Sequence, residues 1–147
     1  MSGRTGDEAG RSEAGSVAVE IALLAPALVL VLGLLVAGGR LWFARTTVAE
    51  AAHASARAAS LARSPGEAKA VGTEAGRQSM ATAGLRCGTS SVQVSAAGFA
   101  VPVGTPATVT SDVSCEVGFA DVFLPGMAGS IHLRGHGSAA LDTYRAR

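Results

Sequence analysis

The sequence predicts an α+β protein in which a long N-terminal transmembrane helix continues into a small domain with an antiparallel sheet. An uncharged apolar run covers residues 21–39, and an alanine-rich stretch without Gly or Pro follows from residue 41 to 63. Three later segments alternate apolar and polar residues at the period of a half-buried strand. We therefore divide the chain into a polar leader (1–15), a transmembrane helix with its helical continuation (16–63) and a small α+β domain (64–147).

The apolar run has the length of a membrane span. Its nineteen residues, from Ile21 to Gly39, form a helix of about 28 Å at 1.5 Å per residue, close to the hydrocarbon thickness of a bilayer. A buried core helix is the alternative, but the remaining sequence is too short and too polar to cover one on all sides. Trp42 and Phe43 follow the run, where interfacial aromatic residues lie.

The segments on either side of the span have clear local signals. The leader is rich in Gly, Ser and charge, which is typical of disorder. After the long helix, Ser64, Pro65 and Glu67 form a helix start with a capping box, which predicts a second helix over 65–83. The alternating segments predict strands at 90–96, 107–117 and 130–141, in a sheet of three or four strands.

Composition limits the classes of function. The chain is 48% hydrophobic but only 4% aromatic, so its apolar side chains are small and each buries little area. The net charge is +1 and no block of like charges occurs, which disfavours nucleic-acid binding.

The two cysteines, Cys87 and Cys115, both fall in the predicted domain. Their spacing does not fit a zinc site, and we expect a disulfide worth roughly 3–4 kcal/mol; two buried thiols are the alternative. A disulfide requires an oxidising compartment, which predicts a cell-membrane protein with a cytoplasmic N-terminus and an extracytoplasmic domain. The arginines after the apolar run favour the opposite orientation by the positive-inside rule.

Glu20 and Pro26 are unfavourable in a plain membrane anchor. An acid at the edge of a span costs free energy unless it is paired. The alternative interpretation is that Glu20 only marks the boundary of the membrane. Cleavage after Gly15 would give Ser16 a new ammonium at i,i+4 from Glu20, and a neighbouring helix's ammonium would then neutralise the carboxylate. Pro26 removes a backbone hydrogen bond and kinks the helix, which neighbouring helices compensate. Both residues indicate a helix that assembles with others.

The same residues follow a known pattern, G-x-x-A-x-E-[FIL]-A-L-x-x-P, at Gly15, Ala18, Glu20, Ile21, Ala22, Leu23 and Pro26. Downstream, Ala56-Arg57-Ala58-Ala59 matches an A-R-A-A setting. The stretch resembles type IV prepilins and, more closely, the TadE-like family of pilus-assembly proteins, the pseudopilins of tight-adherence (Flp-type) pilus systems.

The resemblance implies a pilin-like fold and a role in assembling or priming a Flp-type pilus. It also implies cleavage by a prepilin peptidase between Gly15 and Ser16. The implied partners are membrane lipid, other pilins and pseudopilins, the pilus or secretion platform proteins and the peptidase.

We expect no enzyme activity and no cofactor. His132 and His136 share one face of a strand, but a metal would need a third ligand from Asp112, Asp121 or Asp142, and no ligand spacing supports one. The sequence therefore predicts a solvated strand face. No nucleophile or phosphate-binding motif occurs either.

His53 lies between Glu50 and Arg57 on the alanine-rich helix, which is typical of an exposed polar face. Two alternatives to the pilus role stay open. The first is a single-pass, signal-anchored surface protein with an unrelated binding role. The second is a secreted protein whose signal peptide is cut near residues 37–39, which the length of the run disfavours.

Overall fold

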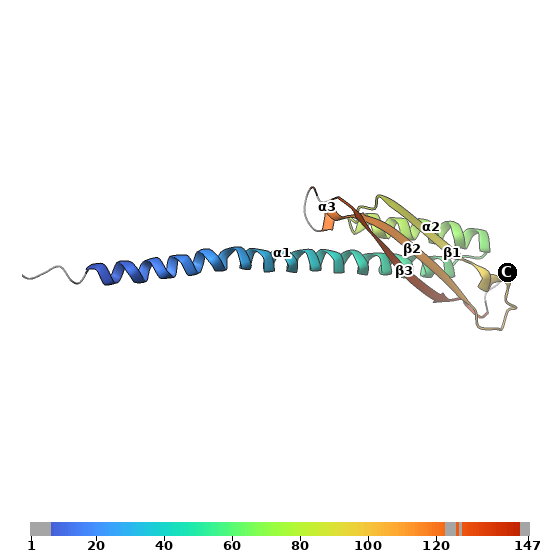
Figure 1. The fold of residues 1–147 in the computed structure, drawn as a ribbon. Helices are drawn as coiled ribbons and strands as arrows, with labels where there is room; N and C mark the ends of the chain where they lie inside the picture. The colour runs from blue at the N-terminus through green and yellow to red at the C-terminus, as the bar shows by residue number, and fades with distance from the viewer. Residues whose placement is uncertain (1–6, 123–125, 127, 145–147) are drawn as a thin grey trace, which may run out of the picture. The chain divides into compact units, whose positions relative to one another are not determined.

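The computed structural model of the chain describes residues 7–122, 126 and 128–144. The chain divides into two compact units, Met1–Gly38 and Gly39–Arg147. One long helix, α1 (Asp7–Ser60), provides the first unit and continues into the second (Figure 1). Residues 39–60 of α1 belong to the second unit and supply part of its core.

The start of α1 differs from the sequence prediction. Residues 7–15, which we expected to be disordered, are helical, and residues 1–6 lie outside the described residues. No proline interrupts the leader, and Glu8, Ala9, Arg11 and Glu13 are compatible with a helix. A helix that is already formed extends at low cost, because each added residue gains a hydrogen bond without a new nucleation step.

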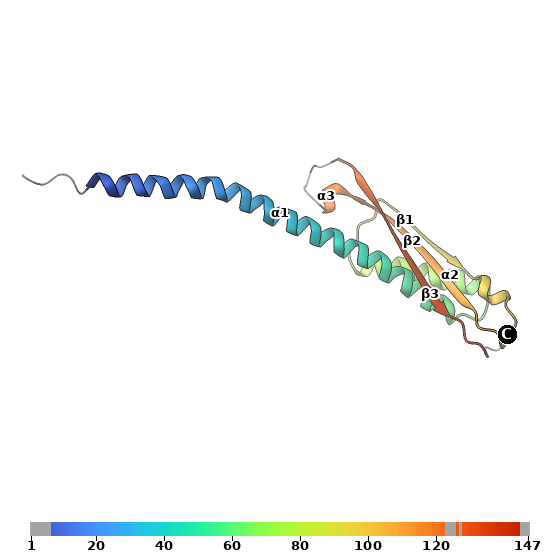
Figure 2. The same cartoon turned by 60° about the horizontal axis from the view of Figure 1, so that its bottom comes forward.

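The second unit has two layers (Figures 1 and 2). The end of α1 and the helix α2 (Pro65–Thr82) lie on one face of a three-stranded antiparallel sheet of order β1-β2-β3. The strands are β1 (Thr89–Ser95), β2 (Thr108–Gly118) and β3 (Ser130–Ala140). A 3-10 turn, η1 (Ala97–Ala100), follows β1, and a short helix, α3 (Phe119–Val122), follows β2. The predicted α+β fold with a long N-terminal apolar helix is confirmed.

Alternation along the strands determines which side chains form the core. On β2, Val109, Val113, Cys115 and Val117 are buried toward the helices, whereas Asp112 faces outward. The register pairs Val113 with Gly135 of β3 and continues without interruption along both neighbouring strands. The outward face of the sheet is polar, so one side of the sheet packs on the helices and the other meets solvent.

Glycines and alanines allow the layers to approach closely. A Cβ at Gly72 or Gly76 of α2 would lie about 3 Å from the side chains of β1 and of α1, and one at Gly135 or Gly137 of β3 would lie less than 2.5 Å from the backbone of α1. Backbone contact brings many atoms within dispersion range. The small residues that predict a weak core thus form a tightly packed one.

Two local predictions are tested by the start of α2. The Ser64 hydroxyl accepts a hydrogen bond from the Glu67 amide at 3.2 Å, so Ser64 is the N-cap. The Glu67 carboxylate accepts from the amide of Arg63 at 3.0 Å rather than from that of Ser64. The reciprocal pair of a capping box is therefore displaced by one residue, but both donors are satisfied.

Candidate membrane and assembly segment

The first unit presents a continuous apolar surface. From Val19 to Val36 the large side chains of α1 are each more than half exposed, as at Leu30 (74%) and Leu34 (74%). Within the described residues, α1 is the one helix long and apolar enough to cross a membrane. So large an apolar surface is unfavourable in water and requires lipid or other helices around it.

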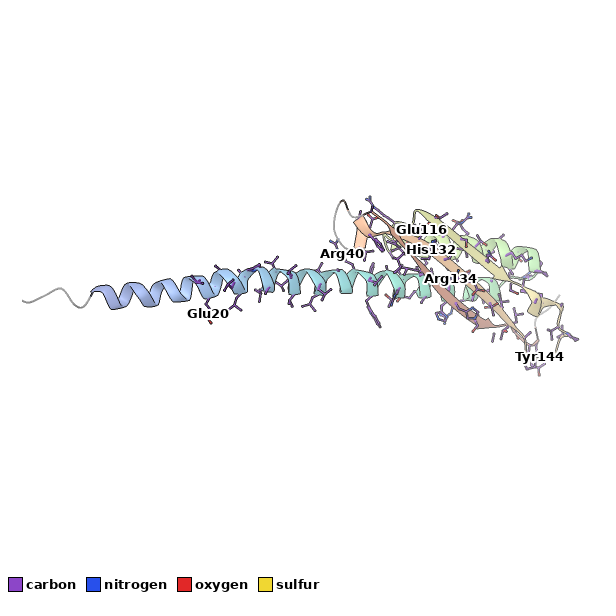
Figure 3. The ribbon with its side chains drawn as sticks, viewed as in Figure 1. Glu20, Arg40, Glu116, His132, Arg134 and Tyr144 are labelled. Carbon is purple, nitrogen blue, oxygen red and sulfur yellow. A yellow bond between two sulfur atoms is a disulfide. The ribbon has the colours of Figure 1, made fainter. Side chains whose placement is uncertain are left out.

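Glu20 lies at the N-terminal border of this surface. Its side chain is exposed and projects outward from α1 (Figure 3), and it has no hydrogen-bond or ion-pair partner among the described residues. Gly15 and Ser16 belong to the same helix, so the backbone of Ser16 lies one turn before Glu20. The carboxylate is therefore free for a partner from another molecule.

Pro26 lies inside α1, and the helix continues through it. Because proline lacks an N–H, the carbonyl of Ala22 has no donor from residue 26. At three of the helix's glycines, positions 33, 38 and 39, an added Cβ would meet nothing within 4 Å. Each costs helix stability of about 1 kcal/mol relative to alanine, and no contact with another described residue explains them.

The apolar surface is followed by cationic and aromatic residues. Trp42 (72% exposed) and Phe43 (55% exposed) project from α1 just after Arg40. Arg40 donates a hydrogen bond from Nη1 to the carbonyl oxygen of Asp121, at 3.5 Å, which brings α3 next to the beginning of the domain. The arrangement fits the predicted interfacial residues of a membrane protein.

The two cysteines are joined by a disulfide between the residues just before β1 and the C-terminal part of β2, with Cα atoms 5.4 Å apart. Cys115 is buried in the core and Cys87 packs against it. The bond fixes the edge strand β1 to the central strand β2 at one end of the sheet, close to Glu116.

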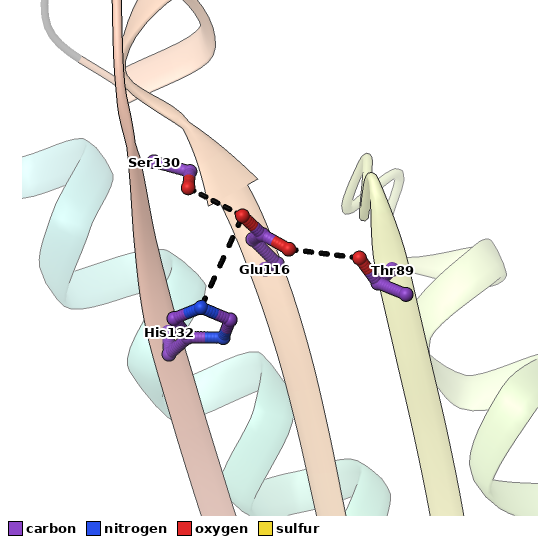
Figure 4. A network of polar contacts seen from close by, with 4 residues as sticks. All are labelled: Thr89, Glu116, Ser130 and His132. Carbon is purple, nitrogen blue, oxygen red and sulfur yellow. Dashed lines mark hydrogen bonds and ion pairs between the residues drawn. The ribbon is translucent and has the colours of Figure 1, made fainter.

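Glu116 is the centre of a polar network on the outward face of the sheet (Figure 4). Its carboxylate accepts hydrogen bonds from the Thr89 hydroxyl on β1, at 2.8 Å, and from the Ser130 hydroxyl on β3. Nε2 of His132 lies 3.9 Å from the same carboxylate. The hydrogen bonds from Ser130 and Thr89 lower the pKa of Glu116. Desolvation raises this pKa in part, and the charge interaction with His132 lowers it further. One carboxylate thus links all three strands.

The residues considered as metal ligands are not brought together. His132 and His136 share the outward face of β3, as predicted, but four residues of strand place them roughly 13 Å apart. Each lies next to a different acid: Nδ1 of His136 is 2.9 Å from Asp112, whereas His132 faces Glu116. In the described part of the chain, no three His, Cys, Asp or Glu side chains lie close enough to hold a metal ion.

Two features of the domain were not foreseen from sequence. The Glu116 network depends on which residues of β1 and β3 lie beside β2, and no motif encodes that register. The second is a buried hydrogen bond from the Ser111 hydroxyl of β2 to the Ser55 hydroxyl of α1, at 2.8 Å. The alternation of β2 places Ser111 on the inward face of the sheet. This was the one sequence signal that could have predicted a buried hydroxyl there.

Together these features define a class of protein: one apolar helix suited to a single membrane pass, followed by a small two-layer α+β domain. Residues 15–57 match the model of the family described as TadE-like protein, which confirms the predicted resemblance. The matched stretch contains Gly15, Glu20, Pro26 and the apolar run, and it ends at Arg57. Neither a curated protein nor a solved structure matches the chain at a significant level.

Proposed function

We propose that this chain acts as a pseudopilin-like membrane protein in the assembly or priming of a Flp-type (tight-adherence) pilus. The match of residues 15–57 to the TadE-like family supports a role in such pilus systems. The observation that carries the more specific role is Glu20, an exposed acid that lies at the edge of an apolar helix and has no partner among the described residues. Its proposed role, and that of the whole chain, is structural rather than enzymatic.

The proposed chemistry begins with cleavage between Gly15 and Ser16 by a prepilin peptidase. Hydrolysis of this peptide bond gives Gly15 a carboxylate and Ser16 an ammonium. Because α1 includes the cleavage site, the peptidase has to unwind the helix locally, and Gly10 and Gly15 make that easier. The new ammonium of one molecule then neutralises Glu20 of a neighbour near the bilayer edge, where an unpaired charge is costly.

The rest of α1 supports lateral assembly. The glycines at 33, 38 and 39 leave open spaces where another helix can approach closely, and a neighbour can offset the hydrogen bond lost at Pro26. In this proposal the N-terminus is cytoplasmic and the disulfide-bearing domain is extracytoplasmic, where the bond is stable. The partners are membrane lipid, other pilins and pseudopilins, and the platform proteins of the pilus machine.

The test is the N-terminal residue of the protein recovered from membranes. A chain that begins at Ser16 supports processing and the pseudopilin role. An intact leader favours the alternative, a signal-anchored surface protein in which Glu20 only marks the boundary. A chain that begins near Arg40 contradicts both, because the apolar segment would then be a removed signal peptide.

A further inference from the structure

β3 is an edge strand of the sheet, and no strand among the described residues pairs with its outer side (Figure 2). It has 11 residues, and its register with β2 continues without a bulge. The strand also contains no proline and no lysine, residues that commonly keep an edge strand from pairing further. β3 therefore offers a long and regular backbone to another strand.

Hydrogen bonds at the two ends of the β2–β3 ladder show which backbone groups of β3 are free. The amide of Leu141 donates to the carbonyl oxygen of Ala107, and the amide of Phe119 donates to that of Gly129, both at 2.9 Å. Bonded and non-bonded pairs alternate in an antiparallel ladder, so the odd-numbered residues of β3 bond to β2. The even-numbered residues direct their N–H and C=O groups away from β2, and all of them are exposed. We call the free side of these residues, 130, 132, 134, 136, 138 and 140, the β3 edge.

Arg134 lies near the centre of the β3 edge and has no acid beside it. β2 places an acid opposite each of the two neighbouring histidines, but it places Ser114 opposite Arg134. The Ser114 hydroxyl shares a hydrogen bond with the hydroxyl of Ser91 on β1, at 2.8 Å. The Arg134 side chain is exposed and has no partner among the described residues. The position on the free side of β3 is therefore the one from which an acid on an added strand can pair with it.

A groove of about 710 Å³ lies between the end of β3 and the uncovered face of α1. An added strand would alternate as β3 does, with one set of side chains beside Arg134 and the other set over this groove. Arg57 is exposed in the groove and, like Arg134, has no partner in the described part of the chain. The strand side of the groove has only small residues, and the complete lining is Glu50, His53, Ala54, Arg57, Ser60, Ser138, Ala139 and Ala140. The groove thus has room for side chains and a cation for a second acid.

We propose that the β3 edge binds an extended segment of another polypeptide as a fourth strand of the sheet, with one acidic side chain beside Arg134 and a second beside Arg57. Addition of a strand satisfies the free backbone groups, and the acids give specificity. The two acids lie on opposite faces of the added strand, so an odd number of positions separates them. Ala139, which lines the groove with Arg57, is five positions after Arg134, so a step of five fits both cations. The inference goes beyond the proposed function and does not require the pilus role.

Charge complementarity determines the occupant. The β3 edge of a second copy would bring its own basic side chains, which offer Arg134 no acid. β1 of a second copy has no charged side chain and would leave Arg134 unpaired as well. An anionic polysaccharide or a lipid headgroup would pair with the arginines but would leave the backbone groups of the β3 edge without a regular partner. An acidic, extended polypeptide satisfies both the backbone and the charges.

Hydrogen exchange of single amides, followed by NMR, tests the strand pairing. The isotope-labelled full-length chain in detergent micelles is titrated with the blocked peptide TETVTVET, whose glutamates are five positions apart and symmetric about its centre. The even-numbered amides from residue 132 to 138 should exchange several-fold more slowly with the peptide. The amides of Leu133 and Gly135, which already bond to β2, should change little. Equal slowing of both sets, or of neither, would overturn the proposal.

Two matched peptides separate the contributions of charge and backbone. TETVTEVT has the same composition, but its glutamates are four positions apart and lie on one face, so it should bind several-fold more weakly. TETVTVET methylated on the backbone nitrogens of its four central residues keeps both charges but cannot donate to β3, and it should also bind several-fold more weakly. Equal binding of the methylated peptide would overturn the proposal by showing that charge alone holds it.

Variants of the full-length chain test the two cations. Arg134→Ala and Arg57→Ala should each weaken the binding of fluorescently labelled TETVTVET several-fold, measured by anisotropy. Arg77→Ala is the matched control, because Arg77 is exposed on α2 and has no partner among the described residues, and it should leave binding unchanged. Equal effects of the three variants would overturn the proposal, since they would indicate a general attraction for acids.

Two further outcomes would also decide against the proposal. Even-numbered amides of β3 that are protected before any peptide is added, in a chain that sediments as a dimer, would assign the β3 edge to a second copy. Absence of peptide binding would overturn the added strand and leave the pilus role intact, because that role is tested separately by cleavage after Gly15.

Discussion

Gly135 of β3 lies directly against Val48 of α1: a Cβ at Gly135 would lie 2.4 Å from the carbonyl oxygen of Val48. Gly137 has the same relation to Ala52, one helical turn further on, at 2.3 Å. Strand and helix are thus in backbone contact, with no side chain between them. This contact explains how a chain with few large apolar residues forms a packed domain.

Gly135→Ala should destabilise the domain. The added methyl overlaps the backbone of α1, which cannot move aside as the end of a flexible side chain can, so the helix and the sheet must separate. We expect a loss of about 1–3 kcal/mol in the free energy of unfolding, as for overpacking of a core. Urea unfolding of the purified chain in detergent, followed by circular dichroism, measures the change.

Gly66→Ala is the matched control, because a Cβ at Gly66 in the first turn of α2 meets nothing within 4 Å. It should leave stability unchanged or raise it, since alanine is the better helix former. Equal losses for the two variants would show that the close approach at Gly135 does not limit packing.

Removal of the disulfide should cost about 3–4 kcal/mol, because a bond that closes a separation of 28 residues restricts the unfolded chain. The change is Cys87→Ala together with Cys115→Ala, and the measurement is the urea midpoint of the variant against the oxidised parent. Reduction of the parent by a thiol should reproduce the loss. A parent whose two thiols react fully with an alkylating reagent before reduction would contradict the bond itself.

Glu116→Gln should change how stability depends on pH. The pKa of Glu116 is lowered in the folded state, chiefly by the hydroxyls of Ser130 and Thr89, so ionised Glu116 favours folding. That contribution is present at neutral pH and is lost as the pH falls from the ordinary value of 4.5 through the lower folded pKa. The parent should therefore be more stable than the variant at pH 7, and the difference should shrink below about pH 4.

Glu74→Gln provides the control for this pH series. The Glu74 side chain is exposed on α2 and has no hydrogen-bond partner among the described residues. Its removal should shift the unfolding midpoint little at any pH. A gap between the parent and Glu116→Gln that is constant from pH 7 to pH 3 would mean that the carboxylate charge does not hold the strands together.

Glu20→Ala should separate membrane insertion from assembly. Removing an acid from the border of an apolar helix lowers the cost of insertion, so the variant should fractionate with membranes as the parent does. Its association with the pilus machinery should be lost, because the proposed ammonium partner has no carboxylate to meet. Co-purification with other pilus components and a count of surface pili measure this, with Glu74→Ala as control. Normal piliation would contradict the pairing.

The positions of the helices and strands could be predicted from local pattern. Alternation predicted every end of β1, β2 and β3 to within one residue, because one buried face imposes a period of two. Ser64 and Pro65 predicted the start of α2 because a helix terminus needs its free N–H groups satisfied. The sequence did not decide between three and four strands, and the sheet has three.

The contacts between elements could not be predicted in this way. The second compact unit begins at Gly39, within α1, because the alanine face of the end of α1 is covered by the sheet and by α2. Alanine-rich sequence is compatible with both a free and a buried helix, so composition did not distinguish them. The Glu116 network depends likewise on the register of three strands.

By itself, the sequence determined the apolar helix, the position of Glu20 and Pro26 within it, and the alternating strands that follow. These features depend on residue type and spacing along the chain. Secondary structure and lipid solubility follow directly from both. Only the tertiary structure decided that Gly135 and Gly137 bring β3 onto α1, that Glu116 links the strands, and that Glu50 and Arg57 stay uncovered. Each of these depends on which distant residues meet, and the packing of the whole domain determines that.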